Sequence, residues 1–204
     1  MNKRYALIGI VDYGAGNIGS LSNALTHLQI KHEISSTPKK LSICDGIILP
    51  GVGAFQAAIQ KLENCDLIPF LKDWAISNKP FLGICLGMQL MLDSSEEDGE
   101  HEGLGLIKGK VSPLVDPPRS IHIGWNLVKP VQSFRALQKS EYAYFVHSFA
   151  CYPEDVDIVI GVTTYGDQFT SMFKRKNMIG VQFHPEKSQR FGLKLLKEFS
   201  NKLI

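Results

Sequence analysis

Residues 81–89 read Phe-Leu-Gly-Ile-Cys-Leu-Gly-Met-Gln, and the rest of the chain can be understood outward from them. The first four residues have the composition of an apolar strand, and residues 86–92 have the spacing of a helix, so Cys85 stands at a strand-to-helix corner. Gly83 and Gly87 lie two residues to either side of it, as a strained nucleophile turn requires. At such a corner a helix N-terminus would stabilise the thiolate. The pattern by itself also fits a small buried cysteine.

A second segment, residues 180–188, reads Gly-Val-Gln-Phe-His-Pro-Glu-Lys-Ser. Residues 179–183 have the composition of a strand, and His184 and Glu186 follow it directly. Residues two apart in an extended chain point to the same side, so the Glu186 carboxylate can orient an imidazole that faces Cys85. Each residue alone is more often structural. Together they predict a nucleophile, base and orienter in the thiol form of a catalytic triad.

Two glycine-rich turns follow predicted strands earlier in the chain. Residues 14–19 spell Gly-x-Gly-x-x-Gly, with Glu33 further on, as in a dinucleotide-binding site. No other part of the sequence supplies a pocket for a hydride acceptor, so we favour a turn that packs closely against another loop. Residues 50–53, Pro-Gly-Val-Gly, are either a loop that presents N–H groups to a ligand or an ordinary tight turn.

These segments resemble the class I (triad) glutamine amidotransferases. The Cys85 corner and the His-Pro-Glu at residues 184–186 carry the likeness, and five motifs occur in the family's order from Asp12 to the C-terminal helix. The Gly-Met-Gln at residues 87–89 and the Gly-Trp-Asn at residues 124–126 are most similar to the glutaminase subunits of imidazole glycerol phosphate synthase, an enzyme of histidine biosynthesis.

The resemblance assigns roles residue by residue. The implied catalytic residues are Cys85, His184 and Glu186. The backbone N–H groups implied for an oxyanion hole are those around Val52, Gly53 and Leu86. The residues implied for glutamine binding are Gly51, Gln89, Ser148 and Phe149, the last two mainly through their backbone. The residues implied at a partner interface are Asn17, Trp125 and Asn126.

His147 is a second candidate catalytic histidine, at the predicted strand of residues 144–149. It ranks below His184 because no acidic residue lies two positions beyond it.

The resemblance implies that L-glutamine is hydrolysed to glutamate and ammonia through a cysteine thioester, with no metal and no organic cofactor. The sequence shows no acceptor domain, so the ammonia has to be used by another protein. The implied partner is the cyclase subunit, a β/α barrel, bound as a heterodimer and fed through an ammonia channel. It would form imidazole glycerol phosphate and AICAR.

Three alternatives remain at this point. The first is a glutaminase subunit of another synthase, of the anthranilate or aminodeoxychorismate type. The second is a cysteine hydrolase of the peptidase or γ-glutamyl type. The third is a dinucleotide-binding module built on Gly14 and Gly16.

The overall composition excludes several broad classes of protein. A length of 204 residues suits one glutaminase domain over residues 1–204. A formal charge of +2 gives no case for a nucleic-acid or membrane surface. The four cysteines are scattered without a Cys-x-x-Cys pair, which argues against a zinc site or a disulfide framework. We therefore expect a reducing, cytoplasmic protein.

The expected fold class is a three-layer α/β domain with a mainly parallel central sheet flanked by helices, plus a smaller antiparallel sheet. The expected strands of the parallel part span residues 5–11, 31–35, 45–49, 80–84 and 179–183. The expected helices span residues 18–28, 54–62, 67–78, 86–92 and 191–203. We also expect a hairpin around Gly166 and a solvated acidic loop over residues 93–102.

Overall fold

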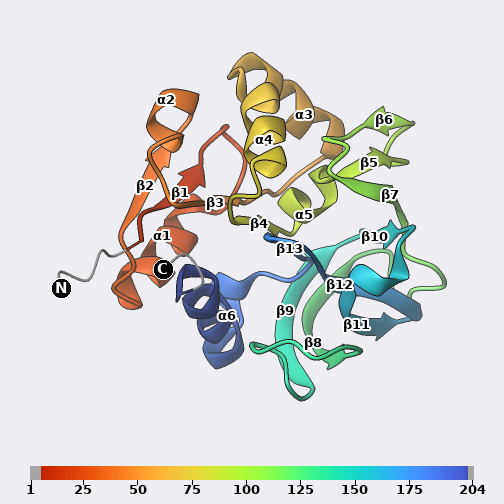
Figure 1. The fold of residues 1–204 in the computed structure, drawn as a ribbon. Helices are drawn as coiled ribbons and strands as arrows, with labels where there is room; N and C mark the ends of the chain where they lie inside the picture. Colours follow the sequence, from red (N-terminus) through yellow and green to blue (C-terminus); the bar gives the residue numbers. More distant parts are fainter. Residues whose placement is uncertain (1–5, 202–204) are drawn as a thin grey trace.

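A computed structural model describes residues 6–201 of the chain. Its centre is a parallel sheet with strand order β2-β1-β3-β4-β13, flanked by helices (Figure 1). These strands are β1 (Ile8–Val11), β2 (His32–Ser35), β3 (Gly46–Leu49), β4 (Phe81–Ile84) and β13 (Met178–Val181). The five predicted parallel strands are therefore confirmed, apart from shifts at their ends.

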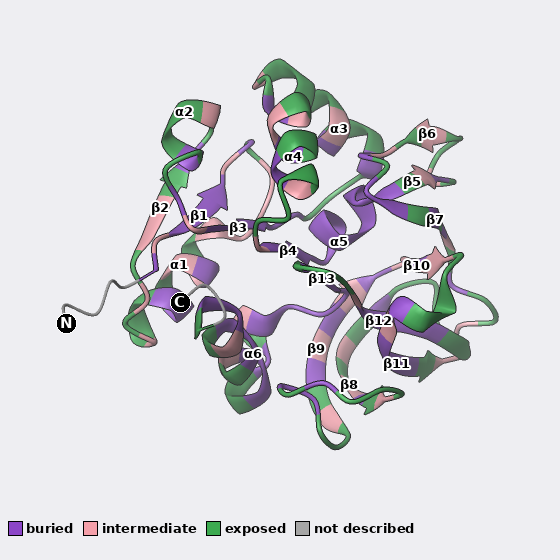
Figure 2. Ribbon diagram, in the orientation of Figure 1, coloured by how far each residue is buried: buried purple, intermediate pink, exposed green. Residues whose placement is uncertain are grey.

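Helices cover both faces of this sheet, which explains why its strands β1, β3, β4 and β13 are apolar, whereas the edge strand β2 is partly polar and only partly buried. Every residue of β1, β3, β4 and β13 is buried, and Figure 2 shows the buried strands between more exposed helices. The helices on one face are α1 (Ile18–His27) and α6 (Gln189–Asn201). Those on the other face are α2 (Pro38–Leu41), α3 (Phe55–Asn64) and α4 (Leu67–Ile76).

Neighbouring residues of a strand alternate between the two cores, as the pleat requires. Ile48 packs with the α1 and α6 side, whereas Ile47 and Leu49 pack with the α3 and α4 side. The three-layer α/β architecture is confirmed.

The remaining strands, nearly all of them paired antiparallel, continue from the same sheet. They join through β12 (Asp167–Arg175), which pairs antiparallel with β13. Beyond β12 the path runs through β10 (Phe149–Pro153), β7 (Ile107–Pro113), β5 (Leu92–Ser95) and β6 (His101–Glu102). A branch from β12 leads to β11 (Val159–Tyr165), β8 (His122–Pro130) and β9 (Glu141–His147). The hairpin of β11 and β12 turns at Gly166, whose φ of 79° suits glycine, so that prediction is confirmed.

Three local predictions were wrong. The helix after Cys85, α5, spans only Leu86–Leu90, because Leu92 leaves it to pair with Ile107. The acidic stretch of residues 93–102 is not simply a loop, since Ser94 and Ser95 pair with residues 101–102. Tertiary pairing overrides local composition in both places.

The third difference concerns the strand predicted over residues 144–149. Ser148 lies between β9, which ends at His147, and β10, which begins at Phe149. The break sends the chain from one set of strand partners to another, with β9 paired to β8 and β10 paired to β7.

The predicted start of the first strand at Tyr5 and the end of the last helix at Leu203 lie outside the described residues. Within residues 6–201, no helix combines the length and the apolar character needed to cross a membrane.

Candidate active site

Cys85 occupies a strained corner between β4 and α5. Its φ of 54° and ψ of −113° are unusual for any residue with a side chain. The flanking glycines are required by close packing, because a Cβ at Gly87 would overlap the carbonyl oxygen of Leu49. A Cβ at Gly83 would lie 2.6 Å from Met91 Sδ. The corner that the sequence predicts is present.

The thiol of Cys85 is nearly enclosed, with 5% of the residue exposed. Its Sγ lies 3.8 Å from the carbonyl oxygen of Val146, to which it can donate, and 3.8 Å from Nε2 of Gln182, from which it can accept. The helix behind it has five residues, so its dipole is weaker than that of the longer helix we expected.

His184 and Glu186 form a buried pair next to Cys85. His184 Nδ1 lies 2.8 Å from Glu186 Oε1, and each side chain is 3% exposed. Burial opposes a charge on His184, but the Cys85 thiolate and the Glu186 carboxylate outweigh it and raise the pKa of His184 to about 10. Nε2 of His184 is buried and has no hydrogen-bond partner within the described residues. The imidazole therefore keeps one nitrogen free for proton transfer.

The segment that carries His184 is tied to β9. The N–H of His184 donates to the carbonyl oxygen of Tyr144 at 2.9 Å. The Ser188 hydroxyl donates to the His184 carbonyl oxygen at 2.7 Å and accepts from the Tyr144 N–H at 3.0 Å. The Ser188 hydroxyl thus links the backbone at His184 to β9, and α6 begins at the next residue.

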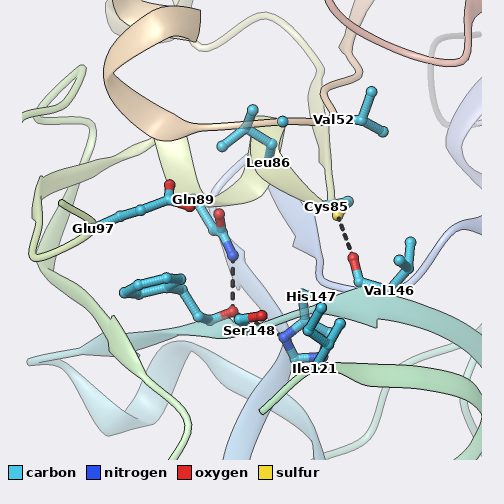
Figure 3. A pocket seen from close by; sticks show the side chains of 11 residues that line it. Val52, Cys85, Leu86, Gln89, Glu97, Ile121, Val146, His147 and Ser148 are labelled. Carbon is cyan, nitrogen blue, oxygen red and sulfur yellow. Dashed lines mark hydrogen bonds between the residues drawn. The ribbon is translucent and has the colours of Figure 1, made fainter.

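A cavity of about 310 Å³ opens beside Cys85. Its walls come from both parts of the sheet, and Figure 3 shows these side chains converging on one space. The lining residues are Val52, Gly53, Cys85, Leu86, Gln89, Glu97, Ile121, Val146, His147, Ser148 and Phe149.

Most of the predicted oxyanion and substrate residues line this cavity, but Gly51 does not. Gly51 is buried, and a Cβ there would meet the Tyr13 hydroxyl and Leu86. Its neighbours Val52 and Gly53 are exposed, and within residues 6–201 their N–H groups form no hydrogen bond. His184 also does not line this cavity, but lies near Pro50 and Gly51.

Glu97 lines the cavity, although its acidic stretch was expected to be a solvated loop. Its Oε2 accepts from the backbone N–H of Phe55 at 2.7 Å. Figure 3 shows Glu97 beside Gln89, at the end of the cavity away from Cys85. Nothing in the spacing of residues 93–102 distinguishes Glu97 from the acids around it, so sequence reasoning had no signal for it.

His147 lines the cavity as a neutral residue. Its Nδ1 faces the carbonyl oxygen of Phe149 at 2.8 Å and therefore carries the proton. Its Nε2 accepts from Nδ1 of His122 at 3.1 Å, and Nε2 of His122 accepts from the Asn126 amide at 3.2 Å. Burial lowers the pKa of His147 to about 3 and that of His122 to about 4. These hydrogen bonds fix the His147 ring in the wall of the cavity, which suits a structural role rather than that of an acid or base.

The glycine turn after β1 packs against the loop after β3. A Cβ at Gly16 would lie 3.3 Å from Pro50 Cγ, which agrees with the close-packed turn we favoured. Asn17 is the N-cap of α1, and its side chain accepts from the Ser20 N–H at 3.4 Å.

Trp125 and Asn126, both predicted at a partner interface, differ in exposure. Trp125 is 47% exposed. The Asn126 amide is used inside the chain, where it donates to the Thr164 carbonyl oxygen at 3.0 Å as well as to His122. Within residues 6–201, no three His, Cys, Asp or Glu side chains are grouped so that they could hold a metal ion.

Comparison with known proteins agrees with this geometry. Residues 9–203 match the family model "Glutamine amidotransferase class-I". The chain is 46% identical to the imidazole glycerol phosphate synthase subunit HisH of Sulfurimonas denitrificans, over 95% of this chain and 97% of that one. It is 42% identical to the HisH subunit of Aquifex aeolicus, over 95% of each chain.

Solved structures support the fold alone. The structure of PurLQS from Thermotoga maritima superposes with a TM-score of 0.77 at 19% identity, covering 98% of this chain and 100% of that chain. The sequence matches go further than this shared fold. The chain belongs to the class I glutamine amidotransferases and, within them, to the family of the HisH subunits of imidazole glycerol phosphate synthase.

Proposed function

We propose that the chain is a glutaminase that hydrolyses the side-chain amide of L-glutamine through Cys85, as a subunit of an imidazole glycerol phosphate synthase. One observation carries the chemistry. Cys85 lines an amino-acid-sized cavity and interacts with His184, which is hydrogen-bonded to Glu186. The assignment to imidazole glycerol phosphate synthase rests on the names of the relatives.

The polar groups of the cavity suit an amino acid bound end to end. Glu97 is the one acidic residue of its lining, and a carboxylate pairs with an α-ammonium group. Ser148 and Phe149 lie at the break between β9 and β10, where backbone groups can meet the α-carboxylate. The side chain of the substrate would then extend toward Cys85, which lies at the other end of the cavity (Figure 3).

The reaction proceeds in two halves. The Cys85 thiolate attacks the carboxamide carbon, and N–H groups around Val52, Gly53 and Leu86 hold the oxyanion. The His184 imidazolium gives its proton to the leaving nitrogen, the C–N bond breaks, and ammonia leaves a glutamyl thioester on Cys85. Neutral His184 then takes a proton from water, whose oxygen attacks the thioester and releases glutamate.

We further propose that a cyclase subunit, a β/α barrel, docks on this chain as a heterodimer and receives the ammonia through a channel. Exposed apolar side chains on β8 and β9 suit such a surface. Ile123 and Trp125 alternate along β8 and are 60% and 47% exposed, Ile121 just before β8 is 45% exposed, and Tyr142 on β9 is 63% exposed. An exposed cluster of this kind marks a protein interface.

The test is glutamate release from glutamine by the purified chain, alone and with the cyclase subunit and its nucleotide ligand. We expect release that rises with the partner and is abolished in Cys85→Ala. Full activity without the partner would contradict the assigned synthase. Activity that survives in Cys85→Ala would contradict the chemistry.

A further inference from the structure

Gln182 is a completely buried amide that contacts the nucleophile, and no step of the reaction above uses it. It is 0% exposed and follows β13 directly, two residues before His184. We infer that Gln182 is a positioning residue of the active site, whose amide N–H holds the sulfur of Cys85 and whose carbonyl oxygen holds the side chain of Gln89.

The orientation of both amides follows from a group that can only accept. The carbonyl oxygen of Phe149 lies 2.9 Å from the end of the Gln89 side chain, so the facing atom must be Nε2 (Figure 3). The same nitrogen lies 3.2 Å from the Gln182 amide, so the atom of Gln182 that faces it must be Oε1. Nε2 of Gln182 is then the atom that lies 3.8 Å from Cys85 Sγ.

This arrangement has a consequence for the nucleophile. An N–H donor stabilises a thiolate more than a thiol, because a hydrogen bond to a charged acceptor is the stronger one. His184 reaches Cys85 from the end of the same segment, since residues 182 and 184 lie on the same side of extended chain. The segment after β13 therefore supplies Cys85 with both a base and a fixed N–H donor.

The arrangement also has a consequence for the cavity. The two N–H bonds of the Gln89 amide are used by Phe149 and Gln182. Its Oε1 is the remaining polar atom, so Gln89 meets a ligand as an acceptor only. Without Gln182 the amide of Gln89 would lose one of the two bonds that prevent it from turning.

The test uses Gln182→Met, which keeps the length of the side chain and removes both of its hydrogen bonds. Ser171→Ala is the matched control, because Ser171 is buried on the neighbouring strand, accepts the Gln182 backbone N–H through its carbonyl oxygen, and has a hydroxyl without a partner in the described chain. The rate of iodoacetamide alkylation of Cys85 is measured from pH 5 to pH 10, with circular dichroism as a check on folding.

We expect the midpoint of alkylation in Gln182→Met to move up by about one pH unit, which is about a threefold loss of rate below the midpoint, because the smaller thiolate fraction is partly offset by a more nucleophilic thiolate. The Ser171→Ala profile should coincide with that of the unaltered protein. In the assembled enzyme, Gln182→Met should raise KM as well as lower kcat, because Gln89 is released. A folded Gln182→Met protein with an unshifted alkylation profile would overturn the inference.

A second measurement covers the case in which Gln182→Met does not fold. In the unaltered protein, the side-chain amide signals of Gln182 should move in NMR spectra as Cys85 ionises, and should stop moving in Cys85→Ala. Signals that are indifferent to Cys85 would overturn the inference. The inference rests on Cys85 as the nucleophile of the proposed function, but alkylation needs no glutamine, so a failure of glutaminase activity is seen separately.

Discussion

His184 and His147 both stand at the end of a strand close to the Cys85 site, yet the fold holds them in opposite charge states. Against the cost of burial, the Cys85 thiolate and Glu186 raise the pKa of His184 to about 10. Burial lowers the pKa of His147 to about 3, where its hydrogen-bond partners are a backbone carbonyl and another neutral imidazole. Position at a strand end does not decide the role of a histidine. The groups that the fold places around the ring decide it.

The comparison extends to the two parts of the sheet. The parallel part places Cys85 at the end of β4 and His184 after β13, two neighbouring strands. The antiparallel part contributes His147, Ser148 and Phe149 to the cavity wall. Reactive groups thus come from one part of the sheet, and fixed groups that shape the cavity come mostly from the other.

The largest expected effect, on the rate of glutamate release, comes from removing the carboxylate charge of Glu186 beside His184. Glu186→Gln keeps the shape of the side chain but no longer fixes the imidazole or its charge, and we expect kcat for glutamate release to fall by about three orders of magnitude. In NMR titrations the pKa of His184 should fall from its raised position. Glu63→Gln, an exposed change of the same kind, should leave both quantities unaltered. A Glu186→Gln enzyme with a tenth of the original activity or more would contradict the orienting role.

An intermediate effect, on the free energy of unfolding, is expected from the neutral histidines His147 and His122 as the pH falls. Their lowered pKa values mean that the unfolded chain gains protons below about pH 6.5 that the folded chain does not. Their contribution to stability is complete above that pH and is lost at about 1.4 kcal/mol per pH unit for each histidine as the pH falls toward 4.

His147→Gln tests this dependence, because glutamine can keep both hydrogen bonds and does not titrate. Urea unfolding at pH 7 and at pH 5 should show a loss of stability that is smaller by about 2 kcal/mol than in the unaltered protein. The exposed His27 provides the control variant His27→Gln. Equal losses in His147→Gln and in the unaltered protein would show that His147 is protonated in the folded state.

The smallest effect on stability is expected at the exposed apolar side chains of β8. Ile123→Ser should change the free energy of unfolding by no more than about 0.5 kcal/mol, because Ile123 is 60% exposed. Activation by the cyclase subunit should nevertheless weaken by about tenfold. Ile76, 83% exposed at the end of α4, provides the control Ile76→Ser. Equal activation of the two variants by the cyclase subunit would show that β8 is not part of the interface.

The parallel strands and the three residues of the proposed triad could be predicted because their signals are local. Cys85 lies in a glycine-flanked corner, and His184 and Glu186 are separated by one residue of extended chain. Residues two apart in an extended chain lie on the same side, so Gln182, two residues before His184, is also expected to face Cys85. Its contact with Cys85 was not predicted, because Gln182 lies in a stretch, residues 179–183, with the composition of an apolar strand.

The sequence by itself determined where along the chain the strands that carry the reactive groups lie and which residue types follow them, since these depend on composition and spacing over a few positions. Tertiary structure alone decided that Glu97 enters the cavity, that His147 stays neutral, and that the helix after Cys85 ends at Leu90. The physical reason is common to all three. Hydrogen bonding, burial and strand pairing depend on groups that lie far away in the sequence, and they can outweigh what a residue and its immediate neighbours prefer.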